Sequence, residues 1–224
     1  MSELYPEKTG PLPAERAAGE PSFDAAGKRL LDLAGAGLAL LFLGPLLLLI
    51  ALLLKLEGGS VFFRHRRIGL NGARFDCLKF RTMVPDAEAA LQKLLACDAR
   101  ARSEWDCNFK LRSDPRITRL GRFLRKTSLD ELPQLINVLR GEMSLVGPRP
   151  IVEEEIARYG SAIRLYFSVR PGITGLWQIS GRNDVDYRAR VTLDASYARD
   201  WSLMKDLMII LRTVQVVLAG RGAY

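Results

Sequence analysis

A long uncharged segment near the N-terminus restricts the fold of this chain more than any other feature. From Leu33 to Leu54, roughly 22 residues carry no charge, which is about the length that an α-helix needs to cross the hydrocarbon core of a bilayer. The start from Met1 to Glu20 is polar, mixes acids with bases and is rich in Pro, Gly and Ala. That composition argues against a secretory signal peptide and is typical of disorder. We therefore expect a disordered tail over 1–22, followed by a membrane segment.

Gly44 and Pro45 lie near the middle of this membrane segment, which we assign to 23–56. Proline removes a backbone donor and clashes with the preceding turn, so a helix broken here could enter the bilayer, turn, and leave by the same face. Proline also occurs in spanning helices that are only mildly kinked. Basic residues flank the segment on both sides, so the positive-inside rule does not choose a topology. A re-entrant hairpin and a single span are therefore both open from the residues alone.

The rest of the chain, 57–224, is expected to form one basic body that faces the cytosol. Lys and Arg number 33 against 25 for Asp and Glu, and the excess is spread along the chain. This balance favours anionic partners, such as phosphates or anionic membrane lipid. Nucleic acid is disfavoured because the aromatic residues are not interleaved with basic ones. The three cysteines are odd in number and lack metal-type spacing, which indicates reduced thiols without zinc or disulfides.

The patterns along this body predict an α+β fold that is mostly helical. Segments 60–63 and 74–80 flank Asn71-Gly72, a dipeptide that favours a tight β-hairpin turn. We also predict helices over 86–106, from Asp114 onward, and over 202–218. In the helix after Asp114, basic residues lie opposite an apolar stripe of Ile117, Leu120, Phe123 and Leu124. Such a helix can lie in a membrane interface, or it can cover a core with a solvated face outward.

Two adjacent acids, Asp130 and Glu131, precede Pro133 just after a basic run. One interpretation is helix capping. Ser128 and Glu131 fit a capping box, but this places Pro133 at the fifth helical position, where proline is unfavourable. With Asp130 as the cap, Pro133 moves into the first turn. In both cases the positive end of a helix favours the ionised acids.

A second interpretation is chemistry at phosphorus. Arg125 and Lys126 precede the acids, Arg149 follows on a Gly147–Pro150 turn, and Lys79 ends the predicted hairpin. An ionised carboxylate among fixed cations could hold a divalent metal on a diphosphate, or attack phosphorus itself. The spacing alone does not exclude capping, because acidic pairs at helix starts are common. His65 is interpreted as a surface or interface cation rather than a base, and the Arg64-His-Arg-Arg67 run as a contact with lipid headgroups.

Several strings resemble the bacterial sugar transferases, the monotopic polyprenyl-phosphate phosphoglycosyltransferases. They are Lys79-Phe-Arg-Thr-Met83, Arg125-Lys-Thr-Ser-Leu-Asp-Glu-Leu-Pro-Gln-Leu135 and Gly141-Glu-Met-Ser-Leu-Val-Gly-Pro-Arg-Pro150. Segments 170–182 and 220–224 are similar to the branch typified by undecaprenyl-phosphate galactose or glucose phosphotransferases of exopolysaccharide and O-antigen synthesis. The resemblance covers about residues 24–224 and makes 57–224 a catalytic domain.

The resemblance implies transfer of hexose 1-phosphate, with galactose favoured over glucose, from a UDP-hexose to undecaprenyl phosphate, with release of UMP. It implies Asp130 as the nucleophile that forms an aspartyl-phosphosugar, and Asp130 with Glu131 as ligands of Mg²⁺. It also implies a re-entrant helix broken at Gly44-Pro45 on the cytoplasmic face of the bacterial inner membrane. Further positions expected to contact phosphates or substrate, or to partner those that do, are Lys79, Arg81, Thr82, Arg125, Pro148, Arg149, Gln178, Arg182 and Asp206.

Two other functions are compatible with these features. A non-catalytic membrane scaffold of polysaccharide assembly would use the basic surface only to hold acidic lipid. A lipid-diphosphate hydrolase would share the carboxylates and the metal but pass the intermediate to water. A homo-oligomer is possible, and the sequence does not decide it.

Overall fold

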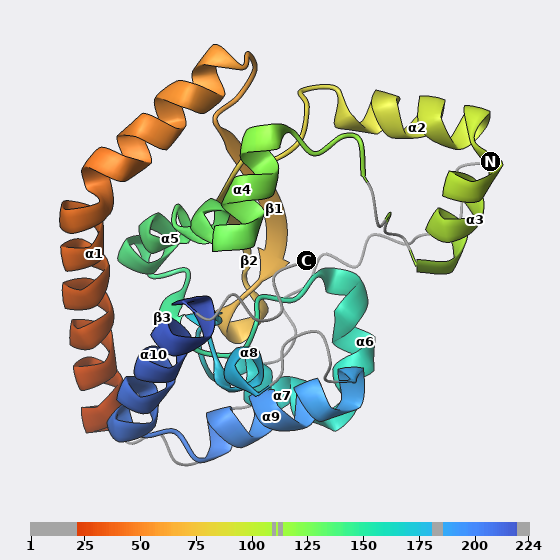
Figure 1. The fold of residues 1–224 in the computed structure, drawn as a ribbon. Coiled ribbons are helices and arrows are strands. Elements are labelled where there is room, and N and C mark those ends of the chain that lie inside the picture. The colour runs from red at the N-terminus through yellow and green to blue at the C-terminus, as the bar shows by residue number, and fades with distance from the viewer. Residues whose placement is uncertain (1–21, 109–110, 112–113, 181–185, 219–224) are drawn as a thin grey trace.

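The computed structural model describes residues 22–108, 111, 114–180 and 186–218, and this part of the chain is mostly helical with two small sheets (Figure 1). The helices are α1 (Ser22–Leu56), α2 (Ala87–Cys97), α3 (Ala99–Asn108), α4 (Arg119–Thr127), α5 (Gln134–Arg140), α6 (Ile156–Tyr159), α7 (Ile163–Phe167), α8 (Leu176–Ile179), α9 (Tyr187–Arg199) and α10 (Leu203–Leu218). The strands are β1 (Phe62–Ile68), β2 (Arg74–Phe80), β3 (Ser144–Val146) and β4 (Gly172–Thr174). Short 3₁₀ turns cover Leu70–Gly72, Leu129–Glu131, Glu153–Glu155 and Gly160–Ala162.

The predicted hairpin is confirmed, with β1 and β2 pairing antiparallel around Asn71-Gly72. Both turn residues adopt positive φ, 55° at Asn71 and 75° at Gly72, which is the conformation that this dipeptide tolerates best. The register pairs Phe63 with Lys79 and His65 with Cys77. Cross-strand partners share one face of a sheet, so the hairpin presents His65 and Lys79 on the same side.

One asparagine attaches α5 to the edge of this hairpin. Asn137 is fully buried, and its Oδ1 accepts a hydrogen bond from the Leu78 amide at 3.0 Å. Its Nδ2 donates to the Asp76 carbonyl at 2.8 Å and to Glu142 at 2.6 Å. The side chain thereby satisfies backbone groups of β2 that would otherwise be left unpaired. This contact fixes where the N-terminal end of α5, and the acidic turn before it, lie against β2.

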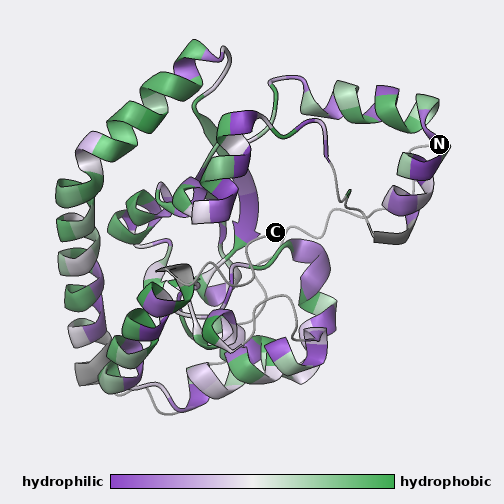
Figure 2. Cartoon of the chain, in the orientation of Figure 1, coloured by the Kyte–Doolittle hydropathy of each residue, from purple (hydrophilic) through white to green (hydrophobic). Residues whose placement is uncertain are grey.

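Helix α1 runs without interruption through Pro45, and Figure 1 shows it bending along its length. It is the one helix in the described ranges that is long and apolar enough to cross a membrane, a character that is visible along it in Figure 2. One side packs on the body, through Ala36 against α5 and through Leu54 against Phe80 of β2. Proline bends helices whether they span a membrane or not, so the bend does not decide between the re-entrant and spanning topologies. The re-entrant hairpin stays a prediction.

The opposite side of α1 leaves large apolar side chains uncovered. Its most exposed members are Leu30, Leu38, Leu41, Phe42, Leu48, Leu52 and Leu56. Helix α10 adds Met204, Leu211 and Val214, and β1 adds Phe62 and Phe63. Exposed apolar surface of this extent marks an interaction site, and on a helix of this length it fits membrane association.

Two predicted helices have different bounds in the structure. The single helix expected over 86–106 is divided at Asp98, whose Oδ1 accepts hydrogen bonds from the amides of Arg100 and Ala101 and so begins α3. Such a side-chain cap competes with continuation of the preceding helix. The helix expected from Asp114 begins only at Arg119, because the Thr118 hydroxyl accepts from the Gly121 amide. The predicted apolar stripe is also incomplete, since Phe123 is 55% exposed. The C-terminal helix is confirmed as α10.

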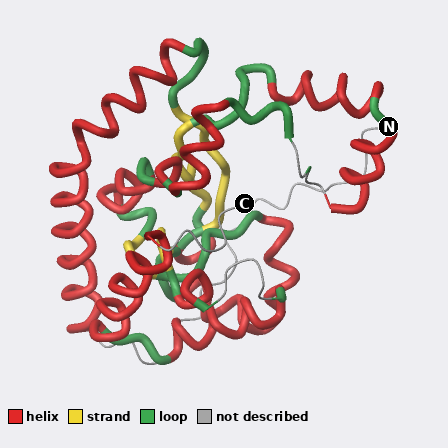
Figure 3. Tube along the Cα trace, in the orientation of Figure 1, coloured by secondary structure: helices red, strands yellow, loops and turns green. Residues whose placement is uncertain are grey.

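A second sheet, which the sequence did not predict, lies under α8 and α10. Strands β3 and β4 pair in parallel, Ser144 with Gly172 and Val146 with Thr174 (Figure 3). Val146 is buried with Tyr197 of α9 and Ile209 of α10. Three-residue strands carry too little alternation to be recognised by pattern. Their importance is positional, because β3 leads directly into Pro148 and Arg149.

Candidate active site

The acidic pair lies in the 3₁₀ turn between α4 and α5. Ser128 ends α4 in the left-handed conformation, with φ 56° and ψ 18°. Ser128 makes no side-chain capping hydrogen bond, and the residue at the N-cap of α5 is Pro133 rather than Asp130. Both predicted caps are therefore wrong. A capping box needs extended backbone at its first residue, and Ser128 instead serves as the C-terminal residue of α4. The carboxylate of Asp130 interacts with its own backbone amide and that of Glu131 with Lys79, so neither acid is committed to capping α5.

Glu131 forms an ion pair with Lys79 of β2. Lys79 Nζ lies 2.6 Å from Glu131 Oε1, and the side chains are 28% and 39% exposed. Lys79 and Glu131 are 52 positions apart in the chain, and the packing of α5 on β2 brings them together. The structure therefore unites two of the predicted site residues in one contact.

Asp130 stands next to this ion pair in a desolvated position. Burial, and then the neighbouring charge of Glu131, raise the pKa of Asp130 to about 6, while Lys79 and Arg125 act in the opposite direction. Burial has this sign because it disfavours the charged form of an acid. At neutral pH the carboxylate is still mostly ionised, and it is less solvated than a surface aspartate. These two properties together suit a carboxylate nucleophile.

Arg125 is held beside the pair by Thr82. Arg125 Nε donates a hydrogen bond to Thr82 Oγ1 at 2.9 Å, and the Thr82 carbonyl accepts from the Thr118 amide at 3.1 Å. Helix α4 approaches this backbone so closely that a Cβ at Gly121 would lie 2.0 Å from the Thr82 carbonyl oxygen. The approach requires glycine, and it sets the position from which Arg125 reaches the site.

Arg81 occupies a different position from that expected of a phosphate contact. Its guanidinium is buried and donates to the Leu54 carbonyl at 2.9 Å and to the Gly58 carbonyl. Glu57 lies at 4.0 Å. These carbonyls close the C-terminal end of α1, where the helix dipole favours a cation. Arg81 therefore binds the C-terminal end of α1 to the body, at the position next to Thr82 in the chain.

His65 and Arg67 of β1 also face this region, which the sequence analysis did not recognise. Arg67 donates to the Pro150 carbonyl at 3.1 Å and lies 3.1 Å from His65 Nδ1. Burial, Arg67, Lys79 and Arg149 lower the pKa of His65, which disfavours the cation that the sequence analysis expected. Side chains alternate between the two faces of a strand. Counting back from the Asn71-Gly72 turn would have placed His65 and Arg67 on the same face as Lys79.

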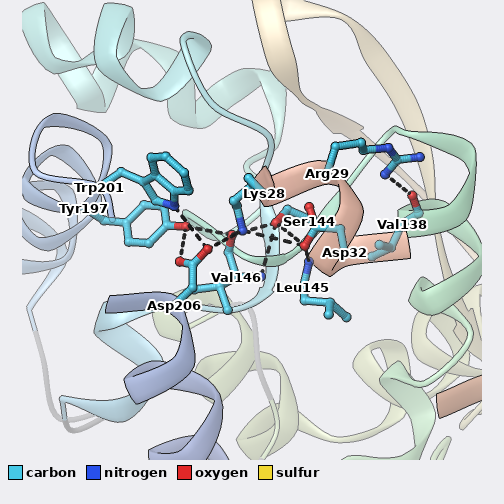
Figure 4. Close-up of polar contacts among 10 residues, drawn as sticks. All are labelled: Lys28, Arg29, Asp32, Val138, Ser144, Leu145, Val146, Tyr197, Trp201 and Asp206. Atoms are coloured by element: carbon cyan, nitrogen blue, oxygen red, sulfur yellow. Dashed lines mark hydrogen bonds and ion pairs between the residues drawn. The ribbon is translucent and has the colours of Figure 1, made fainter. Parts of the chain in front are cut away.

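The remaining predicted residues are distributed over two further places. Pro148 is buried after β3, and Arg149 stacks near the Trp177 ring at 5.8 Å. Gln178 follows Trp177, and its Oε1 is buried without a hydrogen-bond partner in the described chain. Arg182 lies outside the described residues. Asp206 is separate from the acidic pair, because its carboxylate binds Lys28, Tyr197 and Trp201 (Figure 4).

The acidic pair fits Mg²⁺ by its donor chemistry. Mg²⁺ prefers oxygen ligands and is commonly held by one or two carboxylates together with substrate phosphates. Asp130 and Glu131 supply two adjacent carboxylates. Across the described ranges, no group of three or more His, Cys, Asp and Glu side chains converges. The other ligands would therefore come from water and from a bound diphosphate.

The sequence of this chain is similar to those of known sugar transferases. The chain matches the sequence model of the bacterial sugar transferase family over residues 23–220. It is 51% identical over 214 residues to the exopolysaccharide production protein ExoY of Rhizobium meliloti, covering 95% of this chain and 94% of that protein. It is 52% identical over 197 residues to the UDP-galactose-lipid carrier transferase of Erwinia amylovora, covering 88% of this chain and 41% of that protein. The undecaprenyl-phosphate galactose phosphotransferase of Salmonella typhimurium is 50% identical over 197 residues, with 88% and 41% covered. This chain therefore spans about two fifths of the length of the last two relatives.

Proposed function

Because this chain belongs to the bacterial sugar transferase family, we propose that it transfers hexose 1-phosphate from a UDP-hexose to undecaprenyl phosphate and releases UMP. The names of its relatives support a UDP-galactose donor, an undecaprenyl phosphate acceptor and a role in exopolysaccharide production. Galactose is accordingly the favoured hexose and glucose the second. The observation that carries the proposal is the position of Asp130, which is desolvated beside the Lys79–Glu131 ion pair and Arg125.

The proposed reaction has two displacements at one phosphorus atom. A carboxylate oxygen of Asp130 attacks the phosphorus that bears the hexose. The bond between this phosphorus and the UMP oxygen breaks, and its electron pair leaves with UMP. An oxygen of undecaprenyl phosphate then attacks the same phosphorus, and the bond to Asp130 breaks. This step restores the carboxylate and yields hexosyl diphosphoundecaprenol.

The residues around Asp130 have separate roles in this scheme. Lys79 and Arg125 are cations that stabilise the ionised nucleophile and the charge on the transferred phosphoryl group. Glu131 is held by Lys79 and would share a magnesium ion with Asp130. When bound, Mg²⁺ would neutralise charge on the diphosphate and improve UMP as a leaving group. Thr82 orients Arg125 through the hydrogen bond to its Nε.

We also propose that α1 is re-entrant and that the site faces the cytoplasm at the bacterial inner membrane. Both ends of α1 are attached to the same body, through Lys28 and Asp32 at one end and through Arg81 at the other. The roughly 22 uncharged residues from Leu33 to Leu54 would extend about 33 Å if straight, close to the roughly 30 Å of a bilayer core, so the attached ends, and not the length, favour a re-entrant helix. A perpendicular crossing would draw the attached body into the bilayer. A helix bent at Pro45 and inserted in one leaflet avoids this.

Release of UMP from a panel of UDP-sugars, with and without undecaprenyl phosphate, tests the reaction. We expect sustained release only with the lipid, and one stoichiometric burst without it. Asp130→Asn should abolish both while leaving membrane association intact. Asp76→Asn is a matched control, because Asp76 is 45% exposed and pairs only with Arg66 at 3.7 Å. Normal turnover by Asp130→Asn would reject the nucleophile, and steady release without lipid would indicate a hydrolase.

Labelling of single cysteines tests the topology. Cysteines introduced in the N-terminal tail and in the body should both react with a membrane-impermeant reagent added from the cytoplasmic side. The native thiols would first be removed, and the cysteine-free chain must retain UMP release. Labelling of the tail and the body from opposite sides would show that α1 spans the membrane.

A further inference from the structure

Two arginines contact the same indole ring, in a part of the body that lies away from α1. Arg190 of α9 places its guanidinium carbon 4.2 Å from the centroid of the Trp177 ring. Arg149, which follows β3, places its guanidinium carbon 5.8 Å from the same centroid. Trp177 is only 8% exposed, so its ring orients guanidinium groups by cation–π contact. Figure 1 shows α8 and α9, which carry Trp177 and Arg190, on the side of α10 away from the middle of α1.

These two guanidiniums lack a full counterion in the structure as described. Neither forms an ion pair within 4 Å with a described acid. Asp194 acts on both arginines, but burial raises its pKa to about 7 even though Tyr159 donates to it at 2.8 Å. It therefore carries only part of a negative charge at neutral pH. Burial and Arg149 both lower the pKa of Arg190, as expected for two cations that face each other.

Unpaired donors add a second, independent indication of a ligand. Trp177 Nε1 and Arg190 Nε are both buried, and neither has an acceptor among the described residues; Asp194 Oδ1 is also buried and unpaired, so it serves neither donor. Buried donors without partners are costly and uncommon in folded proteins. The oxygens of an ionised phosphate group accept hydrogen bonds. Its negative charge would also balance the positive charges of the two arginines. Such a group would satisfy both the unpaired donors and the excess positive charge.

Arg149 connects this stack to the acidic pair. Lys79 and Arg149 both act electrostatically on His65 and on Cys77, whereas Arg149 also acts on Arg190. Contacts join the same row of cations. Arg67, hydrogen-bonded to His65 on the face of Lys79, donates to the carbonyl of Pro150 next to Arg149. Arg149 shares the Trp177 ring with Arg190. A row of this kind fits the two phosphoryl groups of a nucleotide sugar. The single phosphate of the lipid acceptor would bind on the side of the site nearest the exposed apolar face of α1.

We propose that Arg190, stacked with Arg149 on Trp177, binds the phosphate of the departing UMP while Asp130 attacks the neighbouring phosphoryl group. Trp177 is a positioning residue that orients the two guanidiniums. The inference rests on the proposed function, since it assigns the donor side of the same site. It adds Arg190 and Trp177 to the residues that recognise the donor.

Steady-state kinetics on the full chain in phosphatidylglycerol nanodiscs test this assignment. Arg190→Gln should raise the KM for UDP-galactose about tenfold or more, the usual effect of losing a hydrogen bond to a charged group. The KM for undecaprenyl phosphate should not change. Arg190→Lys should retain part of the donor affinity, because it keeps the charge without the planar fork. Arg158→Gln is the matched control, since exposed Arg158 stacks on Tyr187 at 5.1 Å and not on Trp177.

Thermal shift with UMP alone separates binding from turnover. UMP should stabilise the wild type, Asp130→Asn and Arg158→Gln, and it should not stabilise Arg190→Gln. Equal stabilisation of Arg190→Gln would overturn the inference, as would a raised KM for undecaprenyl phosphate in place of the donor. If the wild type transferred no sugar but bound UMP in an Arg190-dependent way, the proposed reaction would be rejected and the phosphate site would be supported. Circular dichroism of Arg190→Lys guards against loss of folding.

Discussion

Lys28 Nζ lies 2.7 Å from Asp206 Oδ2, and this ion pair joins the N-terminal end of α1 to α10 (Figure 4). The two side chains are 17% and 0% exposed. Lys28 also donates to the Val146 carbonyl at 3.0 Å, while Asp206 accepts from Tyr197 at 2.7 Å and from Trp201 at 3.1 Å. Val146 ends the strand that leads to Arg149. The pair therefore links the position of α1 to that of β3, the strand that leads into the site.

Removing one partner of this pair should destabilise the protein strongly. Lys28→Met leaves a buried carboxylate without its cation, and we expect a loss of about 3 kcal/mol in the free energy of unfolding. Lys28→Met combined with Asp206→Leu should recover much of that loss, because neither charge then remains buried. Chemical denaturation in detergent micelles measures the free energy of unfolding of the single and the double variant. Lys205→Met on the same helix is the control, since the half-buried Lys205 side chain donates to the Asp200 carbonyl and forms no ion pair with a described acid. Equal stability of Lys28→Met and Lys205→Met would contradict the role of the pair.

Asp130→Asn should make the folded protein more stable at pH 8. The folded pKa of Asp130 is about 6, above its usual value of 3.8, so ionisation above pH 6 disfavours the folded state. The neutral amide removes this cost, and we expect a gain of about 1–2 kcal/mol after allowance for partial exposure. The gain should shrink between pH 6 and pH 4, where the folded wild type is already protonated. A loss of stability in Asp130→Asn at pH 8 would argue against desolvation.

The rate of UMP release should fall as the pH is lowered through about 6, because only the ionised Asp130 can attack phosphorus. Lys79 lowers the pKa of Asp130, so Lys79→Met should move the acidic limb of the kcat/KM profile to higher pH, with a reduced maximum. Lys79→Arg retains the charge and should leave the limb near its original position. A Lys79→Met profile that keeps its acidic limb would show that another group controls the rate.

Gly121→Ala should damage the site from a distance. The added Cβ would lie 2.0 Å from the Thr82 carbonyl oxygen, so α4 must move away from Thr82 and carry Arg125 with it. We expect a loss of about 1–3 kcal/mol in stability, the usual effect of overpacking, and a lower kcat. Gly37→Ala is the control, because nothing lies within 4 Å of its added Cβ and alanine favours a helix. If both variants were equally stable and active, the close packing of α4 would not be required.

Local patterns were sufficient for elements in which each residue's neighbours in sequence are also its neighbours in space. The hairpin turn at Asn71-Gly72, the long apolar helix and the C-terminal helix belong to this group. The predicted caps of the acidic turn failed because Ser128 was needed to end α4. Asp98 divided a predicted helix for a similar reason, since its side chain made a local hydrogen bond that hydrophobic spacing does not record.

The sequence by itself determined the apolar helix, the basic balance and the motif residues from Lys79 to Arg149, because composition, period and residue identity are local properties. Tertiary structure alone decided which of these residues meet. Packing of α5 on β2 brought Lys79 to Glu131, and burial raised the pKa of Asp130. Packing of α1 on the body placed Asp206 against Lys28 and Arg81 against the C-terminal end of α1. Contacts between residues 23 to 178 positions apart depend on how the elements pack, and no local pattern encodes that packing.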